Sequence, residues 1–367
     1  MMQSYSFLPL HGGRAPKWLY SRMVKLISLI SNEIIDEFGA DELIKRLTDP
    51  YWFQALSCAV GYDWHSSGTT TVTMAALKEA LNENSDVYIA GGKGKAGLKT
   101  PNDIIKGSDY LSISNSDKFI KYSRLTAKID SSLIYDNFGI YHHNFIFSKN
   151  KWGVVQQGMF SNNSNTAIRF QISSDKIDLE NLSNEPNTSI NGNKSQTTLD
   201  LTFNKNSKIK SSSLNMIKES FNDIINFDKA YYLPSRHNIL ENIDINKSAA
   251  NLLKYANEIQ PKDYDELLLV KGIGRKTLRS IALISSLIYK DEIYERDPVL
   301  YSYNLGGKDG IPYKINLNDY DTVITSMKDI INNIKLNKYD QDNILKHLNN
   351  DLESHYIDDQ KNKKVVI

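Results

Sequence analysis

The segment from 263 to 289 carries the residue pattern in this chain that is most typical of phosphate binding. Three leucines lead into the run Val270-Lys271-Gly272-Ile273-Gly274-Arg275-Lys276-Thr277. Two glycines two residues apart favour a tight turn whose backbone N–H groups point outward at the start of the next helix. Four basic side chains accompany the turn, namely Lys271, Arg275, Lys276 and Arg279. Backbone donors and cations both bind phosphate, so the pattern predicts contact with a nucleic-acid backbone without sequence readout. The alternative is an ordinary turn between two helices.

This segment resembles the helix-hairpin-helix of DNA repair proteins. In the glycosylases of that superfamily, a lysine of the segment is the nucleophile and a later aspartate assists it. The resemblance therefore implies a Schiff-base role for Lys276 at the sugar C1′, with Asp297 stabilising the cationic sugar. The chain departs from those enzymes because it has no cysteines for an iron–sulfur cluster. Asp297 followed by Pro298 is also a common helix start, which is the alternative for that residue.

The N-terminal half holds a second set of candidate catalytic residues. They lie in a glycine-bounded loop and around a predicted helix–strand junction, and they are Asp63, His65, Asp130, Asp136, His142 and His143. Gln156 and Gln157 follow on the next predicted strand. Side chains alternate along a strand, so one histidine and one glutamine can share a face with an aspartate. We expect Asp136, His142 and His143 as ligands of Mg²⁺ or Mn²⁺ used in phosphodiester hydrolysis. The alternative is a set of hydrogen-bonded polar residues in a half-buried sheet.

Two glycine-rich segments supply further lysines. The first, GGKGKAGLKTP at 91–101, contains Lys93 and Lys95, and the second contains Lys308. Glycines and lysines together can cradle a phosphate, so a nucleic-acid backbone contact is predicted for these lysines. Nucleotide binding and a simple solvated loop are the alternatives, since the Gly-Lys-Ser/Thr ending of a P-loop is absent.

Hydrophobic periodicity indicates the elements that position these residues. Helices are expected at 16–47 with a break at Phe38-Gly39, at 72–82 and at 116–134. Strands are expected at 87–90, 139–147, 152–160, 167–173 and 198–203, with a hairpin between the second and third. The segments 174–197 and 204–213 are polar, and we expect a long surface loop and a linker there. From 214 to about 350 the pattern is helical.

The predicted fold class is an α+β N-terminal domain, made of helices and a small antiparallel sheet, followed by an all-α helix-hairpin-helix C-terminal domain. The first domain, with the candidate active site, spans 1–210. The second spans 211–355, and 356–367 form a polar tail.

The amino-acid composition is that of a globular protein with a hydrophobic core. The chain has 367 residues, 40% hydrophobic and 24% charged, which is enough to build a core and excludes a disordered chain. The 44 basic and 43 acidic side chains leave a net charge of +1, so any nucleic-acid footprint must be local. A single cysteine, Cys58, excludes an internal disulfide. Without a membrane-spanning run or signal layout, we expect a cytoplasmic protein with no membrane partner.

Several segments together resemble Domain of Unknown Function 763, a mostly archaeal family. The similar segments include LPLHGGRAPKWL, GGKGKAGLKTP, WGVVQQGM, GIGRKTLRSIAL and DPVLYSYNLGGKDGIPY, as well as 47–71. The resemblance covers nearly the whole chain and implies a microbial cytoplasmic protein with a helix-hairpin-helix, without assigning an activity. Asn304 stands where a histidine is expected.

These observations lead to one leading hypothesis and two alternatives. The leading one is a DNA-processing enzyme of the repair or nuclease type, whose C-terminal part grips the DNA backbone while the N-terminal part supplies the catalytic site. The second is a DNA-binding module without catalysis. The third is a DNA glycosylase or abasic-site lyase that uses Lys276 and Asp297.

Overall fold

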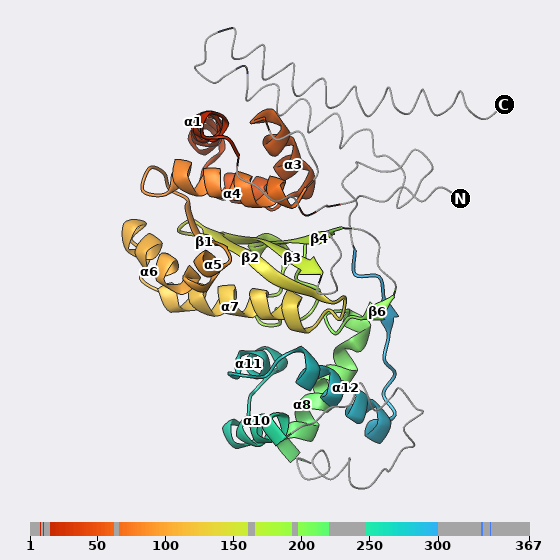
Figure 1. The fold of residues 1–367 in the computed structure, drawn as a ribbon. Coiled ribbons are helices and arrows are strands. Elements are labelled where there is room, and N and C mark those ends of the chain that lie inside the picture. Colours follow the sequence, from red (N-terminus) through yellow and green to blue (C-terminus); the bar gives the residue numbers. More distant parts are fainter. Residues whose placement is uncertain are drawn as a thin grey trace, which may run out of the picture.

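The computed structural model describes residues 8, 10, 15–61, 66–160, 166–192, 197–219, 247–299, 332 and 338. Within them the fold is a mixture of helices and a small antiparallel sheet (Figure 1). No described helix is both long and apolar enough to cross a bilayer.

The centre of the molecule is a five-stranded antiparallel sheet in the order β1-β2-β3-β4-β5. Its strands are β1 (Tyr88–Lys93), β2 (Phe138–Phe147), β3 (Trp152–Phe160), β4 (Ala167–Ser173) and β5 (Ser189–Asn191). The expected hairpin between β2 and β3 is confirmed, and the turn is fastened by Ser148, whose N–H donates to the carbonyl of Lys151. A β-bulge between Ile140 and His142 shifts the register near the start of β2. The bulge adds one residue and so redirects the side chains that precede it.

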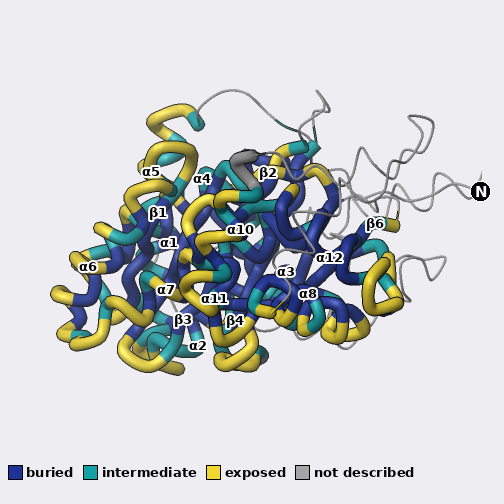
Figure 2. Tube along the Cα trace, turned by 90° about the horizontal axis from the view of Figure 1, so that it is seen from below, coloured by how far each residue is buried: buried dark blue, intermediate teal, exposed yellow. Residues whose placement is uncertain are grey.

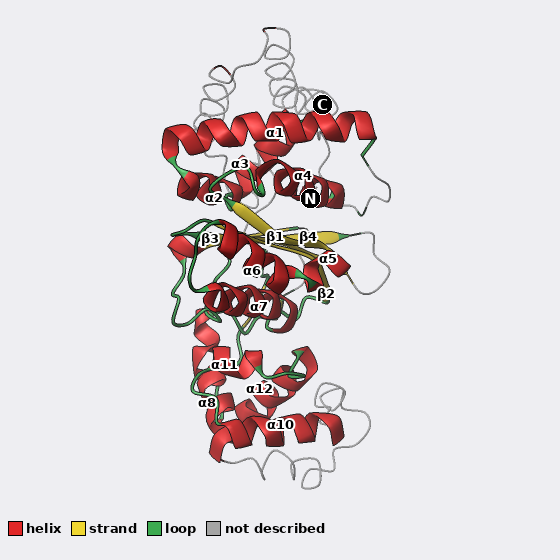
Figure 3. Cartoon of the chain, turned by 90° about the vertical axis from the view of Figure 1, so that its left-hand side faces the viewer, coloured by secondary structure: helices red, strands yellow, loops and turns green. Residues whose placement is uncertain are grey.

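One face of the sheet is covered by the first four helices (Figure 3). These are α1 (Lys17–Phe38), α2 (Ala40–Leu47), α3 (Pro50–Ala59) and α4 (Ser67–Leu81). The predicted break at 38–39 is confirmed: Gly39 has φ +87° and ends α1. A cluster that includes Ile27, Phe53 and Leu77 packs these helices on Val155 of the sheet. Helix α4 begins earlier than expected, because Ser66 caps it and buried Thr69 completes the capping box.

The other face carries α6 (Thr100–Tyr110) and α7 (Ser116–Ser132) (Figure 1). Short helix α5 (Lys95–Leu98) connects β1 to α6 and lies on the surface, where Figure 2 shows it mostly exposed. Helix α7 is buried on both sides, since the sheet lies above it and further helices lie below it. It is therefore the element that connects the sheet to the hairpin region.

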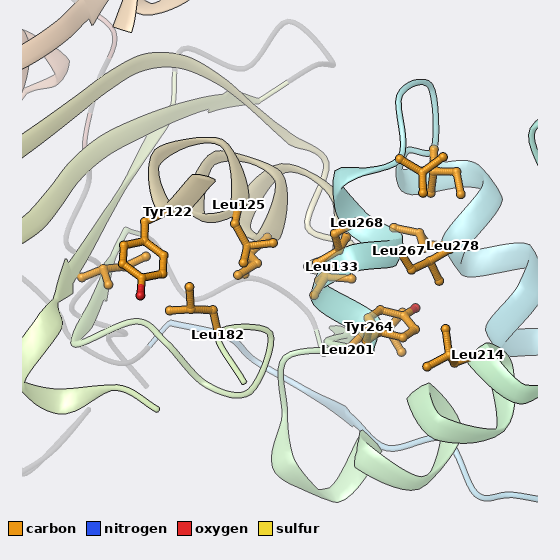
Figure 4. Packing of buried hydrophobic residues seen from close by; sticks show 14 of the residues in the cluster. Tyr122, Leu125, Leu133, Leu182, Leu201, Leu214, Tyr264, Leu267, Leu268 and Leu278 are labelled. Atoms are coloured by element: carbon orange, nitrogen blue, oxygen red, sulfur yellow. The ribbon is translucent and has the colours of Figure 1, made fainter. Parts of the chain in front are cut away.

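Below α7 lie α8 (Ser207–Glu219), α10 (Lys247–Ile259), α11 (Tyr264–Leu269) and α12 (Arg275–Tyr289). One hydrophobic cluster runs without interruption from the sheet through α7 into these helices. Figure 4 shows Leu125 and Leu133, from α7 and its C-terminal end, beside Leu267 and Leu268 of α11. The hydrophobic core thus continues from the sheet into the helices that follow residue 207.

Two expectations about polar segments were wrong. The segment 174–197 contains a short 3₁₀ helix (Ser174–Lys176) and strand β5, and it buries Leu182 and Ile190. The expected linker at 204–213 contains a second 3₁₀ helix (Asn204–Asn206) and the start of α8, where Ile209 is buried. The predicted strand at 198–203 shrinks to β6 (Thr198–Leu199), which pairs with β7 (Glu295–Arg296) in a region expected to be all helical. These segments are ordered with few apolar residues because their backbone N–H and C=O groups form hydrogen bonds with distant parts of the chain.

Candidate functional site

The predicted hairpin between α11 and α12 is present, and its two glycines differ in what they require. Gly272 has φ +93°, and a Cβ there would lie 2.7 Å from the Leu252 Cδ2 atom. Glycine is therefore needed at 272 by the fold itself. Gly274 has an ordinary extended backbone (φ −146°), and a Cβ there would meet no atom within 4 Å. Nothing inside the described structure requires glycine at 274, so the open space beside it is available to a ligand.

The turn presents backbone donors that have no internal partner. Among the described residues, no hydrogen bond uses the N–H groups of Gly272, Gly274, Arg275 or Lys276 as donor. The first internal bond of α12 runs from the Leu278 N–H to the Gly274 carbonyl. These donors stand at the positive end of a 15-residue helix. Such a set of N–H groups is suited to an anion such as a phosphate.

The back of the turn is held by a lysine of α7. The Lys128 Nζ atom donates to the carbonyls of Leu268, Val270 and Ile273 at 2.6, 3.1 and 3.0 Å. Its ammonium therefore satisfies three carbonyl groups of the hairpin, while several N–H groups of the turn have no partner among the described residues. Partial burial lowers the pKa of Lys128. The hairpin is thus fixed to α7 by a side chain remote in sequence.

Two of the four predicted hairpin cations point into the protein. The Arg275 guanidinium donates to the carbonyls of Ser131 and Phe138, at 2.9 and 2.5 Å. The Arg279 guanidinium lies 5.4 Å from the centre of the Tyr135 ring. In turn the Tyr135 hydroxyl donates to the Arg275 carbonyl, and burial raises the pKa of Tyr135. Arg275 and Arg279 thus join α12 to the end of α7.

Lys271 and Lys276 are the exposed cations of the turn. Neither ammonium group forms a hydrogen bond or ion pair with another described residue. Asp297, the predicted assistant of Lys276, instead accepts a hydrogen bond from the Val299 N–H at 3.0 Å. The geometry therefore presents Lys276 to solvent beside the free N–H groups.

A hydrogen-bond network of buried polar side chains connects α7 to the sheet. The Ser123 hydroxyl pairs with His143 Nε2 at 2.8 Å, and His143 Nδ1 pairs with Gln156 Oε1 at 2.7 Å. The Gln156 amide donates to Asp130 Oδ2, and the Asn187 amide donates to Asp130 Oδ1 at 3.0 Å. The structure thus brings Asp130 and His143 together through Gln156.

Burial determines the charge of Asp130 and His143 in this network of polar side chains. It raises the pKa of Asp130 to about 7, although the hydrogen bonds from Gln156 and Asn187 act in the opposite direction. Burial lowers the pKa of His143 to about 4, so its imidazole is neutral near pH 7. Each member has a hydrogen-bond partner, and all are buried except Asn187, which is half-buried. This arrangement stabilises the contact between α7 and the sheet.

His142 lies on the opposite face of the sheet, with Gln157 as its cross-strand neighbour. The Gln157 amide donates to the Ser67 carbonyl at 3.1 Å and to the hydroxyl of half-buried Tyr141. No hydrogen bond of ordinary geometry reaches either ring nitrogen of His142 or Gln157 Oε1 among the described residues, although the nearby Asn144 side chain acts to raise the pKa of His142. Burial lowers the pKa of His142 to about 3, so this imidazole is also neutral. Buried polar atoms without partners are uncommon, and they often mark a binding or catalytic function.

Asp136 stands apart from both histidines. Its carboxylate lies 4.0 Å from the Arg275 guanidinium and accepts from the Phe138 N–H at 3.0 Å. Burial raises the pKa of Asp136 to about 7. His142 and His143 face opposite sides of the sheet, so the described structure does not assemble the expected Asp136–His142–His143 ligand set. Among the described residues, no group of three or more His, Cys, Asp or Glu could hold a metal ion.

The first glycine-rich segment packs tightly on β2. A Cβ at Gly91 would lie 2.3 Å from the His143 carbonyl oxygen, and the Gly94 N–H donates to the Tyr141 carbonyl at 2.7 Å. Lys93 and Lys95 are exposed. Three other predicted site residues, Asp63, His65 and Lys308, lie outside the described residues.

Sequence reasoning missed Lys128 and Asn187. Lys128 is one of many lysines on a predicted amphipathic helix, and its three acceptors are about 140 positions away in the chain. Asn187 lies in the segment expected to be a surface loop. No sequence signal identified either residue, because Lys128 meets the hairpin and Asn187 meets Asp130 only through the packing of segments far apart in the chain.

The comparisons with known proteins agree with the resemblance seen in the sequence. The family model described as a protein of unknown function (DUF763) matches residues 4–315. Searches of curated proteins and of solved structures return no match. Because the family match spans most of the chain, including the sheet and the hairpin, the protein belongs to the DUF763 family.

Proposed function

We propose that this protein is a DNA-processing protein that grips the DNA backbone through the α11–α12 hairpin. The observation that carries the proposal is that the carbonyl groups of the turn have a partner and several of its N–H groups do not. Lys128 takes the carbonyls of the turn, while the N–H groups of Gly272 and Gly274 lack internal partners. A phosphate is the ligand that suits outward N–H groups at a helix start.

The charge around the turn supports the same ligand. Lys271 and Lys276 flank the free donors and are exposed, so they can pair with neighbouring phosphates. Arg275 and Arg279 are occupied by the contacts to α7 and Tyr135. The hairpin is therefore expected to neutralise two phosphates rather than the four that its composition suggests.

Binding measured against salt concentration tests this proposal. Fluorescence anisotropy with a labelled DNA duplex gives the slope of log K against log salt concentration. The double variant Lys271→Gln/Lys276→Gln should reduce the magnitude of that slope by about 1.8, since each neutralised phosphate contributes about 0.9. The matched control is Lys17→Gln/Lys25→Gln on α1, which removes two exposed lysines on the far side of the sheet (Figure 1). An equal change in both double variants would refute a hairpin interface.

A second candidate function is phosphodiester hydrolysis in the region of His142. The observation that favours it is the pair of ring nitrogens without a hydrogen bond of ordinary geometry, on a buried, neutral imidazole next to Gln157. A neutral imidazole is the form that binds a transition metal such as Mn²⁺, and Gln157 Oε1 is an oxygen ligand of the kind that both Mn²⁺ and Mg²⁺ accept, so Mn²⁺ or Mg²⁺ remains the cofactor that we propose for this activity. DNA and RNA should be cut in the presence of Mn²⁺ or Mg²⁺ and not in EDTA. His142→Ala should lose cleavage and keep salt-dependent binding; cleavage at the wild-type rate by that variant would exclude this site.

A further inference from the structure

Helix α5 is a short surface element that is firmly held from below. The Gly94 N–H donates to the Tyr141 carbonyl at 2.7 Å, and the Thr100 hydroxyl donates to the Gly97 carbonyl at 2.6 Å. Before it, the Gly91 backbone is fixed by Lys78 and Asp103, which bond its carbonyl and its N–H. The backbone that carries α5 therefore has a defined position relative to β2.

Leu98, the last residue of α5, is 83% exposed. It is the most exposed of the large hydrophobic side chains in the described part of the chain. Lysines surround it in sequence, and all are exposed, namely Lys93, Lys95, Lys99 and Lys106. The acidic residue of this stretch, Asp103, is paired with Lys78 at 2.5 Å. An exposed leucine with four exposed lysines nearby in sequence is suited to a partner that is both anionic and apolar.

The α5 segment and the hairpin contact the same short part of β2. Gly94 bonds to the carbonyl of Tyr141, and Arg275 bonds to the carbonyl of Phe138, three residues earlier. A β-strand advances by about 3.3 Å per residue, so these two attachment points are about 10 Å apart. Strand β1 pairs with β2 only from His142 onward, so among the described residues it leaves this part of β2 uncovered on that side. Both elements are therefore attached to neighbouring residues near the start of β2.

We propose that Leu98 is a wedge that enters the base stack of the same DNA whose backbone the hairpin holds. This inference rests on the proposed function and adds the form of DNA that the protein prefers. Apolar side chains, leucine among them, open base steps in proteins that bend DNA, while neighbouring cations hold the phosphates on each side. Nucleic acid combines negative phosphates with apolar base faces, which is the combination that Leu98 and its lysines complement.

The preferred DNA follows from the cost of opening a step. Unstacking is least unfavourable where a base pair is already mismatched or missing. Wild-type protein should therefore bind a duplex with one central mismatch about tenfold more tightly than the matched duplex. Because the wedge provides the preference, Leu98→Ser should bind the two duplexes equally, within about twofold, with the affinity that the hairpin alone supplies.

The test uses full-length protein and a duplex that carries 2-aminopurine beside a central mismatch. Emission of 2-aminopurine rises when the base loses its stacking partners. Saturating wild-type protein should raise the emission, and Leu98→Ser should abolish most of that rise while anisotropy still reports binding. Leu179→Ser is the matched control, because it removes another exposed leucine far from α5 in sequence, and it should behave as wild type.

The outcomes separate the wedge from the hairpin interface. Bound wild-type protein that leaves the emission unchanged would overturn the wedge and leave the hairpin proposal standing. No salt-dependent binding of any duplex would overturn both. If Leu98→Ser binds and unstacks DNA as wild type does but changes the molar mass in light scattering, then Leu98 is the contact surface of a second copy and the wedge is wrong.

Discussion

Replacing Lys128 by methionine tests whether the hairpin depends on α7. Methionine keeps an unbranched side chain of similar length against the neighbouring residues but removes the ammonium. The carbonyls of Leu268, Val270 and Ile273 then lose their donor in a half-buried place. Each net hydrogen bond contributes about 1 kcal/mol, so the loss amounts to about 3 kcal/mol before relaxation. Two effects reduce the expected loss of unfolding free energy to about 2 kcal/mol. Water can hydrogen-bond to the exposed carbonyls, and the variant no longer has to bury an ammonium group.

Urea unfolding gives this loss as a change in the free energy of unfolding. Amide hydrogen exchange reports whether the change is centred on the turn, where protection of α11 and the start of α12 should fall first. The matched control is Lys121→Met, two turns earlier on α7, where the lysine is exposed and the expected change is within about 0.5 kcal/mol. DNA affinity should fall for Lys128→Met and remain for Lys121→Met. Equal stability and exchange in the two variants would refute the view that Lys128 organises the turn.

Three further results are expected. Burial raises the pKa of Asp130 and of Asp136 to about 7, so these two carboxyls bind more protons in the folded state than in the unfolded chain between about pH 4 and 7. Burial lowers the pKa of His142 and His143, and these two histidines contribute the opposite slope below about pH 6.5, so the carboxyl contribution is read from the difference between wild type and Asp130→Asn. In urea titrations wild type should lose stability relative to Asp130→Asn as pH rises from about 4 to 7, by up to about 4 kcal/mol; a difference that does not change with pH contradicts the assignment. Gly272→Ala should cost about 1–3 kcal/mol in the same assay because of its positive φ and the contact with Leu252; no loss would mean that the turn relaxes freely. Arg275→Met should lower the thermal midpoint by several degrees, since two carbonyls lose their donor, whereas Lys276→Met should leave it unchanged; equal midpoints would show that Arg275 does not join α12 to the sheet.

The sequence predicted those elements whose signals are local. Alternating residues and a short polar turn predicted β2 and β3, and Gly39 marked the end of α1. The Gly-Ile-Gly pattern predicted the hairpin, because a turn with positive φ needs glycine at Gly272. In these cases the residues that decide the structure are neighbours in the chain.

The missed features depend on partners far apart in the chain. The basic residues around the turn led us to predict Arg275 as a phosphate contact. Its guanidinium instead donates to the carbonyls of Ser131 and Phe138. Polar composition suggested a linker near 210, yet Lys210 is buried and donates to the carbonyl of Ser183. Periodicity cannot reveal such pairs, because the same lysine or arginine is equally suited to solvent.

The same reasoning applies to the candidate sites. Alternation along β2 predicted that His142 and His143 face opposite sides, and this is confirmed by their partners. It did not show that the face with His143 would also hold Asp130, while Asp136 would turn toward Arg275. The positions of Asp130 and Asp136 depend on where α7 ends relative to the sheet, and that is decided by how the hydrophobic core packs.

The affinity of Gly274→Val for duplex DNA tests the central claim most directly. The backbone at Gly274 is extended, and the open space beside it accepts a side chain without a clash inside the described structure. The variant should therefore unfold at the same urea concentration as wild type. Its side chain stands beside the free N–H groups, where it would exclude a phosphate, so the loss of one or two charge-assisted hydrogen bonds should weaken binding by about tenfold or more. A folded Gly274→Val that binds DNA with wild-type affinity and salt dependence would contradict the account.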